Sequence, residues 1–345
     1  MYRTITGAHA AGIAACLWLA PLVSAQEAAP VAAKSLGGIE RNDPRFDKLI
    51  PAGAKIEILA EGFDWSEGTA WDRKGGSVVF SDVPRNVVHR WKSGDREASV
   101  FLKPSGYTGK EPRGGEPGSN GLLFDKDGKL ILCQHGDRRI ARLEADGSFT
   151  TLADRFEGKR FNSPNDAVLH SDGSIYFTDP SYGLEGGEKS PLKEIPFNGV
   201  YRLAKDGKVT LITKEMSHPN GIGLSPDEKT LYVANSDSER AIWMAFDLKD
   251  DGTVANGRVF FDATRGTKTL KGLPDGLKVD KAGNVFATGP GGVLVFDPDG
   301  THLGTLVTGV PNGNVAFGGE DGSTLFIAAD MYLARVKTTT KGQGF

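Results

Sequence analysis

Six oxygen-bearing side chains stand at the start of short apolar stretches in this sequence, at near-regular intervals. They are spaced by 53, 45, 55, 55 and 39 residues, and they are Glu67, Asn120, Asn165, Asn220, Asp275 and Asn314. Self-similarity at a period of about 40 to 55 residues is typical of radial or stacked repeats. If every repeat begins its inner strand in this way, the six oxygens converge at one end of one axis. The pattern therefore predicts a metal site.

The residue types favour a hard cation. Calcium accepts about six to eight oxygen ligands from carboxylates, amides and water. Glu67 and Asp275 would neutralise a divalent ion, and Asn165 and Asn220 would add neutral oxygens. Because no cysteine and histidine cluster has zinc spacing, a hard cation is favoured over a soft one. Ca²⁺ is the ion we expect, and Zn²⁺, Mn²⁺ or Mg²⁺ stay possible. The alternative is that Pro-Asn-Gly and Pro-Asp-Gly are only turns that begin strands.

The remaining pattern predicts an all-β fold. Short strands rich in Val, Ile, Phe and Tyr alternate with Asp-Gly pairs, which favour tight hairpin turns. Four strands in about 50 residues, repeated six times, indicate a six-bladed β-propeller with four-stranded blades around a central metal site. We expect one domain over residues 51–340. Residues 54–59 have no partner in their own repeat, so we expect them to close the ring by pairing with the last one.

The first 50 residues have the pattern of a targeting segment and a leader, and lack the strand pattern of the rest of the chain. Residues 1–25 combine a basic start, an apolar stretch and small residues before Gln26, which predicts a signal peptide cut after Ala25. An uncleaved anchor is the alternative. Residues 26–50 lack periodicity and are interpreted as a flexible leader. We therefore expect a periplasmic or secreted protein. A formal charge of −3 without charged blocks argues against nucleic-acid binding, and no membrane association is expected after cleavage.

Several other features have a structural interpretation. Cys133 is the only cysteine after the signal and is expected to be a small buried hydrophobe. Asp82 and Asp179 close second strands and are also expected to be structural. Arg138, Arg139 and Arg142 are interpreted as solvated charges at a strand edge. Two long Gly- and Pro-rich insertions, residues 104–119 and 182–197, are expected to wall the central pocket, with a plain surface excursion as the alternative.

A family resemblance joins these features. The stretches 65–71 (WSEGTAW), 118–122 (GSNGL), 133–139 (CQHGDRR), 163–166 (SPND), 177–184 (FTDPSYGL), 218–221 (HPNG), 273–276 (LPDG) and 314–319 (NVAFGG) resemble the gluconolactonase, senescence-marker-protein and luciferin-regenerating-enzyme family. The resemblance covers about residues 45–336. One departure is Gly68-Thr69, where the family often has Gly-Pro. The resemblance implies a six-bladed propeller with one divalent ion, commonly calcium, that hydrolyses lactones.

Matching the family position by position assigns roles to single residues. The resemblance implies that Glu67, Asn165, Asn220 and Asp275 are metal ligands, and that Asn120 faces the substrate. We add Tyr182 and Asn314 as substrate-binding residues.

The expected reaction is metal-assisted hydrolysis of a sugar lactone such as glucono-1,5-lactone. A water near Asp275 or Asp166 would lose its proton to that carboxylate, with His135 as an alternative proton carrier. His135 could equally be a structural residue that caps the following turn. No Gly-x-Ser-x-Gly motif in a strand–turn–helix context suggests an acyl-enzyme route.

Two other functions fit the same pattern. The propeller could act on a different lactone, an aryl ester or an organophosphate, because pocket shape decides the substrate. It could also be a non-catalytic propeller that binds a protein or glycan, although such a protein has no need of two axial carboxylates. The expected partner is a small-molecule lactone, and the sequence leaves monomer and dimer open.

Overall fold

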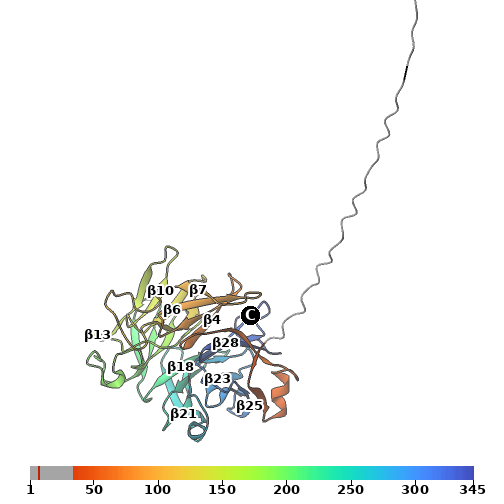
Figure 1. Cartoon of the computed structure of the whole chain (residues 1–345). Coiled ribbons are helices and arrows are strands. Elements are labelled where there is room, and N and C mark those ends of the chain that lie inside the picture. The colour runs from red at the N-terminus through yellow and green to blue at the C-terminus, as the bar shows by residue number, and fades with distance from the viewer. Residues whose placement is uncertain (1–6, 8–33) are drawn as a thin grey trace, which may run out of the picture. The chain divides into compact units, whose positions relative to one another are not determined.

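The protein folds as a propeller of six antiparallel sheets. The computed structural model describes residue 7 and residues 34–345. Four of the sheets have four consecutive strands in the order inner to outer, and the last two are completed or widened by strands from the N-terminal side. Figure 1 shows the sheets arranged around a common centre. The prediction of an all-β, six-bladed propeller with four-stranded blades is confirmed.

The first three blades take their strands from consecutive stretches of the chain. Blade 1 contains β4 (Ser66–Asp72), β5 (Ser77–Asp82), β6 (Val87–Lys92) and β7 (Ser99–Leu102). Blade 2 contains β8 (Ser119–Phe124), β9 (Leu130–Gln134), β10 (Arg139–Leu143) and β11 (Phe149–Ala153), followed by the small hairpin of β12 (Arg155–Phe156) and β13 (Lys159–Arg160). Blade 3 contains β14 (Ala167–Leu169), β15 (Ile175–Asp179), β16 (Gly199–Leu203) and β17 (Val209–Thr213).

The other three blades follow the same plan. Blade 4 contains β18 (Pro219–Leu224), β19 (Thr230–Asn235), β20 (Ile242–Leu248) and β21 (Val254–Asp262). Blade 5 contains β22 (Leu277–Val279), β23 (Val285–Gly289), β24 (Gly292–Phe296) and β25 (His302–Val307). Blade 6 contains β26 (Asn314–Gly318), β27 (Thr324–Ala329), β28 (Tyr332–Lys337) and, from the N-terminal side, β3 (Ile56–Glu61). Short 3₁₀ turns lie at η1 (Pro44–Lys48), η2 (Gly187–Lys189) and η3 (Gly266–Lys268).

A strand from the N-terminal side closes the ring. β3 pairs antiparallel with β28, with Leu333 opposite Ala60, and so becomes the outer strand of the last blade. This confirms the closure expected for residues 54–59. Pairing the first strand with the last covers sheet edges that would otherwise be open to other chains.

Residues 34–50 are folded, so the prediction of a flexible leader is wrong for this part of the chain. β1 (Ser35–Leu36) pairs with β3, and β2 (Gly38–Arg41) pairs with β25, which widens the last two sheets. Phe46 in η1 is fully buried and lies against Gly304, whose missing side chain leaves room for the ring. The sequence showed no periodicity here because the strands are two and four residues long. The signal peptide predicted for residues 1–25, apart from residue 7, and residues 26–33 fall outside the described residues.

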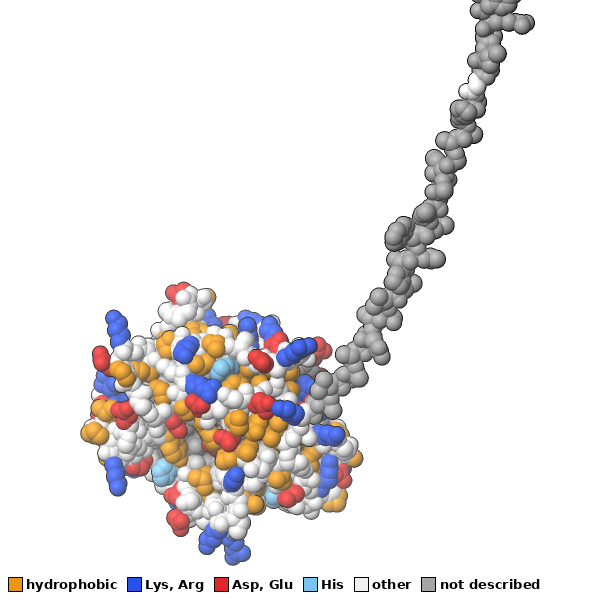
Figure 2. Space-filling model, in the orientation of Figure 1, with side chains coloured by type: hydrophobic (Ala, Val, Ile, Leu, Met, Phe, Trp, Pro, Cys, Tyr) orange, Lys and Arg blue, Asp and Glu red, His pale blue; other side chains and the backbone are white. Residues whose placement is uncertain are grey.

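The core fills the spaces between neighbouring blades. Buried side chains such as Phe177, Trp243, Phe286 and Phe296 face from one sheet to the next and form contiguous apolar clusters. In Figure 2, charged side chains are scattered over the face seen, with apolar ones gathered near its middle. In the part of the chain that the structure describes, no helix has the length and apolar character needed to cross a membrane.

Replacing Phe46 by alanine tests whether η1 belongs to the folded domain. We expect Phe46→Ala to lower the free energy of unfolding by about 3–5 kcal/mol, because a buried aromatic ring is lost from a packed cluster. Urea unfolding of the purified protein measures this. Asp47→Ala is the matched control, since its side chain is 64% exposed and pairs only with Arg41 at the surface. Equal stability of the two variants would restore the flexible-leader interpretation.

Candidate active site

The inner strands of all six blades start at the same mouth of the propeller axis. A cavity of about 470 Å³ lies there and gathers residues from every blade. Its lining comprises Trp65, Glu67, Glu116, Asn120, Asn165, Tyr182, Asn220, Ser236, Ser238, Thr267, Leu270, Gly272, Leu273, Asp275, Pro311 and Asn312. Five of the six positions singled out in the sequence are therefore brought together, and Asn314 is not among them.

Five side-chain oxygens in this cavity lack a hydrogen-bond partner. They are the Oδ1 atoms of Asn120, Asn165, Asn220, Asp275 and Asn312, and all five are buried. A buried polar atom left unpaired costs about 1–3 kcal/mol, so a cluster of five in one cavity calls for a common partner. An all-oxygen donor set with two carboxylates has the chemistry that a hard divalent cation requires. The residues present fit the implied ion.

Burial and neighbouring carboxylates disfavour the charged forms of Glu67 and Asp275 in this cavity. Burial raises the pKa of Glu67, and nearby Asp166 and Glu116 raise it further, while the Gly68 N–H donates to Oε2 at 2.9 Å and opposes the shift. Burial also raises the pKa of Asp275 well above its usual range, with the Glu67 carboxylate as the next cause. A positive charge between these groups would relieve both effects.

Asn314 lies deeper along the axis than we predicted. Its Nδ2 donates to Asp166 Oδ2 at 3.3 Å, and its Oδ1 accepts from the Val315 N–H and from Lys278 Nζ. The sixth blade instead presents Asn312, whose Oδ1 is one of the unpaired atoms. The sequence contained this signal, because Asn312-Gly313 repeats the Asn-Gly pair of residues 120–121 and 220–221.

Two of the three predicted proton carriers do not line the cavity. Asp166 is buried, and its Oδ1 accepts from the Ala167 N–H at 2.9 Å. His135 is fully buried behind Asn165, with His135 Nε2 3.5 Å from Asn165 Nδ2. This contact orients the amide so that Asn165 Oδ1 faces the cavity. Of the three, only Asp275 lines the cavity, so the structure favours a positioning role for His135.

Glu116 is a cavity residue that our sequence reasoning missed. Its carboxylate Oε2 lies 3.2 Å from His135 Nδ1, as a close contact and not a hydrogen bond. The side chain is 35% exposed, so it is open to solvent on its cavity side. Glu116 belongs to the insertion of residues 104–119, where a single acid among Gly and Pro residues carried no periodic signal.

The second insertion supplies Tyr182, as predicted. Its hydroxyl donates to the Ser236 carbonyl oxygen at 3.1 Å, and its ring stacks on His218 with centroids 5.8 Å apart. Glu188 anchors this loop, because its carboxylate accepts hydrogen bonds from the side chains of Ser181 and Lys193. Both insertions therefore contribute to the cavity wall, and Tyr182 is held in place by two contacts.

Close contact between neighbouring blades explains why glycine follows so many of these residues. A Cβ on Gly221 would lie 2.1 Å from the Asp275 carbonyl oxygen, and one on Gly68 would lie 1.8 Å from that of Asn120. Hydroxyls fix the same contacts, since Ser81 donates to the Asn120 carbonyl oxygen at 2.8 Å and Thr178 to that of Asn220 at 2.7 Å. The Asn-Gly and Asp-Gly pairs thus set the spacing of the ring.

Asp82 and Cys133 have the structural roles that the sequence predicts, but Arg138 differs from its prediction. Asp82 accepts from the backbone of Asp64 and Trp65, and burial raises the pKa of the Cys133 thiol, as expected for a core cysteine. Arg138 is not a solvated charge. It is 4% exposed, and its Nε donates to the Phe161 carbonyl oxygen at 2.7 Å.

Comparison with known proteins places this architecture in a family. A family model described as the SMP-30/Gluconolactonase/LRE-like region matches residues 65–330. The chain belongs to this family. A gluconolactonase from Zymomonas mobilis is 42% identical over 316 residues, which cover 89% of this chain and 88% of the relative. A pentonolactonase from Haloferax volcanii is 30% identical and covers 76% of this chain and 80% of its own.

A solved structure agrees with the sequence relatives. A gluconolactonase from Xanthomonas campestris superposes with a TM-score of 0.77 at 31% identity, covering 91% of this chain and 99% of that one. The resemblance seen in the motifs is therefore confirmed. So is the prediction of a lactonase-type enzyme, because these family members are lactonases by name.

Asp179 gives a pH-dependent test of the packing behind the site. Burial raises its pKa to about 7, although the Asn162 N–H donates to it at 2.8 Å. The folded protein thus holds a proton that the unfolded chain releases near pH 4, so this residue lowers stability as pH rises from about 4 to about 7. We expect Asp179→Asn to become more stable relative to the parent across this window, by up to about 4 kcal/mol, and to level off above it.

Urea unfolding of both proteins at pH 4, 5, 6, 7 and 8 measures the difference. Taking the difference between the two proteins removes the contributions of the other carboxyl groups, which both share. A constant difference across the whole series would show that Asp179 is ionised in the folded protein.

Proposed function

We propose that this protein hydrolyses a sugar lactone of the glucono-1,5-lactone type to the aldonic acid, with one divalent cation held on the propeller axis. The observation that carries the proposal is the cluster of five unpaired buried oxygens beside Glu67 in one cavity. The Zymomonas gluconolactonase, at 42% identity over most of both chains, supports the substrate class.

Glu67, Asn165, Asn220 and Asp275 are the proposed ligands, and calcium is the favoured ion. They supply only carboxylate and amide oxygens, which suit a hard cation. Their charges balance a divalent ion, since they include two carboxylates. A cation bound there would polarise the lactone carbonyl as a Lewis acid. Asn120 and Asn312 present the other two unpaired amide oxygens to the cavity, where they can accept hydrogen bonds from sugar hydroxyls.

The wall of the cavity would orient the sugar ring and limit access of water. Trp65, Tyr182, Leu273 and Pro311 supply the larger apolar surfaces. Tyr182 is fixed through its hydroxyl and its stacked ring, so little side-chain freedom would be lost when a substrate binds. Ser236 and Ser238 place further polar groups at the rim.

Glu116 is the proposed general base. Asp275 lines the cavity too, but a carboxylate that holds a cation is a weak proton acceptor because the positive charge lowers its pKa. Glu116 is outside the proposed ligand set, lines the same cavity and is open to solvent. It would take the proton of the attacking water and return it to the ring oxygen, which becomes a hydroxyl when the acyl C–O bond breaks and the ring opens.

Two variants separate the roles of these carboxylates. Initial rates of glucono-1,5-lactone hydrolysis are measured by pH-stat, with the spontaneous rate subtracted, for calcium-loaded and chelator-treated protein. We expect Glu67→Gln to lose bound calcium and to fall in rate by about 100-fold or more, since a charged ligand is gone. We expect Glu116→Gln to keep calcium and to lose about 100-fold or more in kcat, the contribution of a general base.

Glu111→Gln is the matched control, because Glu111 is an exposed acid in the same insertion. It should keep both calcium and rate. Parent protein that binds calcium but shows no turnover would point to another lactone, an aryl ester or a phosphoester. Full activity of Glu116→Gln would remove Glu116 as the base and return that role to Asp275.

A further inference from the structure

A second cavity lies at the opposite end of the inner strands. It measures about 400 Å³ and is formed by the C-terminal ends of β4, β8, β14, β18, β22 and β26, together with Gly342, Gln343 and Phe345. Glu67 and Asp72 mark the two cavities on the single strand β4. Glu67 lines the first cavity and residues 69–72 line the second, and the two linings share no residue, so the cavities are distinct sites on one axis.

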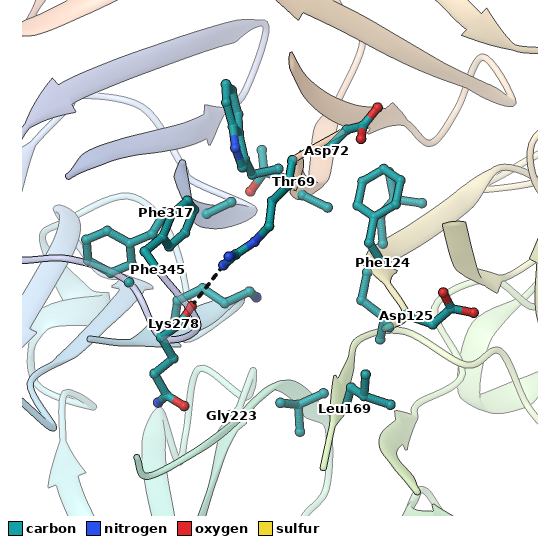
Figure 3. A pocket seen from close by; sticks show the side chains of 18 of the residues that line it. Thr69, Asp72, Phe124, Asp125, Leu169, Gly223, Lys278, Phe317 and Phe345 are labelled. Atoms are coloured by element: carbon teal, nitrogen blue, oxygen red, sulfur yellow. Dashed lines mark hydrogen bonds between the residues drawn. The ribbon is translucent and has the colours of Figure 1, made fainter. Parts of the chain in front are cut away.

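Much of this cavity is apolar. Figure 3 shows Phe317 and Phe345 on one side and Phe124 on the other, with Leu169 below. Phe345 is held in place because the guanidinium of Arg73 lies 3.9 Å from its ring centroid and donates to the Gly344 carbonyl oxygen. Cavities of about 300–1,000 Å³ with a largely apolar lining are typical small-molecule sites.

Four cations surround the same cavity without good carboxylate partners. Arg73, Lys74 and Lys126 donate to backbone carbonyl oxygens, and no carboxylate of the described residues lies within 4.0 Å of their charged groups. Lys278 Nζ donates to the Leu277 carbonyl oxygen at 3.0 Å and to Asn314 Oδ1 at 3.3 Å, and only reaches Asp166 at 4.0 Å.

The acids at this mouth do not offset those charges by direct pairing. Asp72 accepts from the Gly75 N–H at 2.8 Å, and Asp125 accepts from the Asp127 and Lys129 N–H groups at 2.9 and 2.8 Å. Each carboxylate uses its Oδ1 atom within its own turn. The cavity therefore combines an apolar body with excess positive charge that is contacted mainly by neutral oxygens.

We propose that this second cavity binds a small amphipathic monocarboxylate. Lys278 and Arg73 would contact the carboxylate, and Phe124, Phe317 and Phe345 would enclose the apolar part. Charge-assisted hydrogen bonds to a carboxylate are stronger than the bonds these cations now make to carbonyl oxygens. Lys278 Nζ, which now donates to Asn314 Oδ1, would donate to the bound carboxylate instead.

Titration calorimetry of the full-length protein with hexanoate tests the proposal without relying on lactonase activity. We expect saturable binding of one hexanoate per chain. Hexanamide, which has the same shape without the charge, should bind at least about tenfold more weakly. Lys278→Met and Arg73→Met should each weaken hexanoate binding by about tenfold. Lys249→Met, which removes an exposed lysine that follows β20 in blade 4, should leave it unchanged.

Competition distinguishes the two cavities and the source of the carboxylate. Gluconate carries a carboxylate on a polar body, so it should not displace hexanoate, and Tyr182→Ala should bind hexanoate normally. Displacement by gluconate, or loss of binding in Tyr182→Ala, would place hexanoate in the first cavity and overturn the proposal. It would equally be overturned by the absence of saturable binding, or by unchanged affinity in both Lys278→Met and Arg73→Met.

Discussion

The burial of Glu67 and Asp275 in one cavity is the constraint on which the rest of the site depends. Two carboxylates out of contact with bulk water repel each other, and burial alone disfavours the charged form of each. Four unpaired amide oxygens around them add to the cost. Replacing these groups by apolar ones would give a more stable propeller, so their presence is explained by function and not by folding.

The propeller provides the rigidity that such an arrangement needs. Inner strands begin against the backbone of the next blade, with glycine at positions such as 68 and 221 where a side chain would collide, and with the Ser81 and Thr178 hydroxyls donating to neighbouring carbonyl oxygens. Ring closure through β3 and β28 joins the last blade to the first, so no blade can shift independently. His135 and the contact between Tyr182 and Ser236 then fix single side chains. The site is therefore set by backbone packing before any ligand binds.

The sequence predicted the parts that repeat and missed the parts that do not. Six periods of strand and turn indicated the blades and five of the six ring positions, three of which are Asn-Gly or Asp-Gly pairs. The sixth was misplaced because both Asn312 and Asn314 open the last repeat, and only the packing of Gly313 against Glu67 selects Asn312. Glu116 comes from an aperiodic insertion and could be placed only by its contact with His135. Residues 34–50 were misjudged because their two short strands depend on partners outside that segment.

Titration calorimetry of chelator-treated protein with calcium is the most direct test of the central claim, that the axial oxygens form one cation site. The account predicts binding of one calcium ion per chain, with a rise in Tm on binding because the ion stabilises only the folded ring. Asn220→Ala should weaken this binding, since one of the unpaired oxygens is removed. Failure to bind calcium, zinc, manganese or magnesium, with an unchanged Tm, would contradict the account and favour a propeller that acts without a metal.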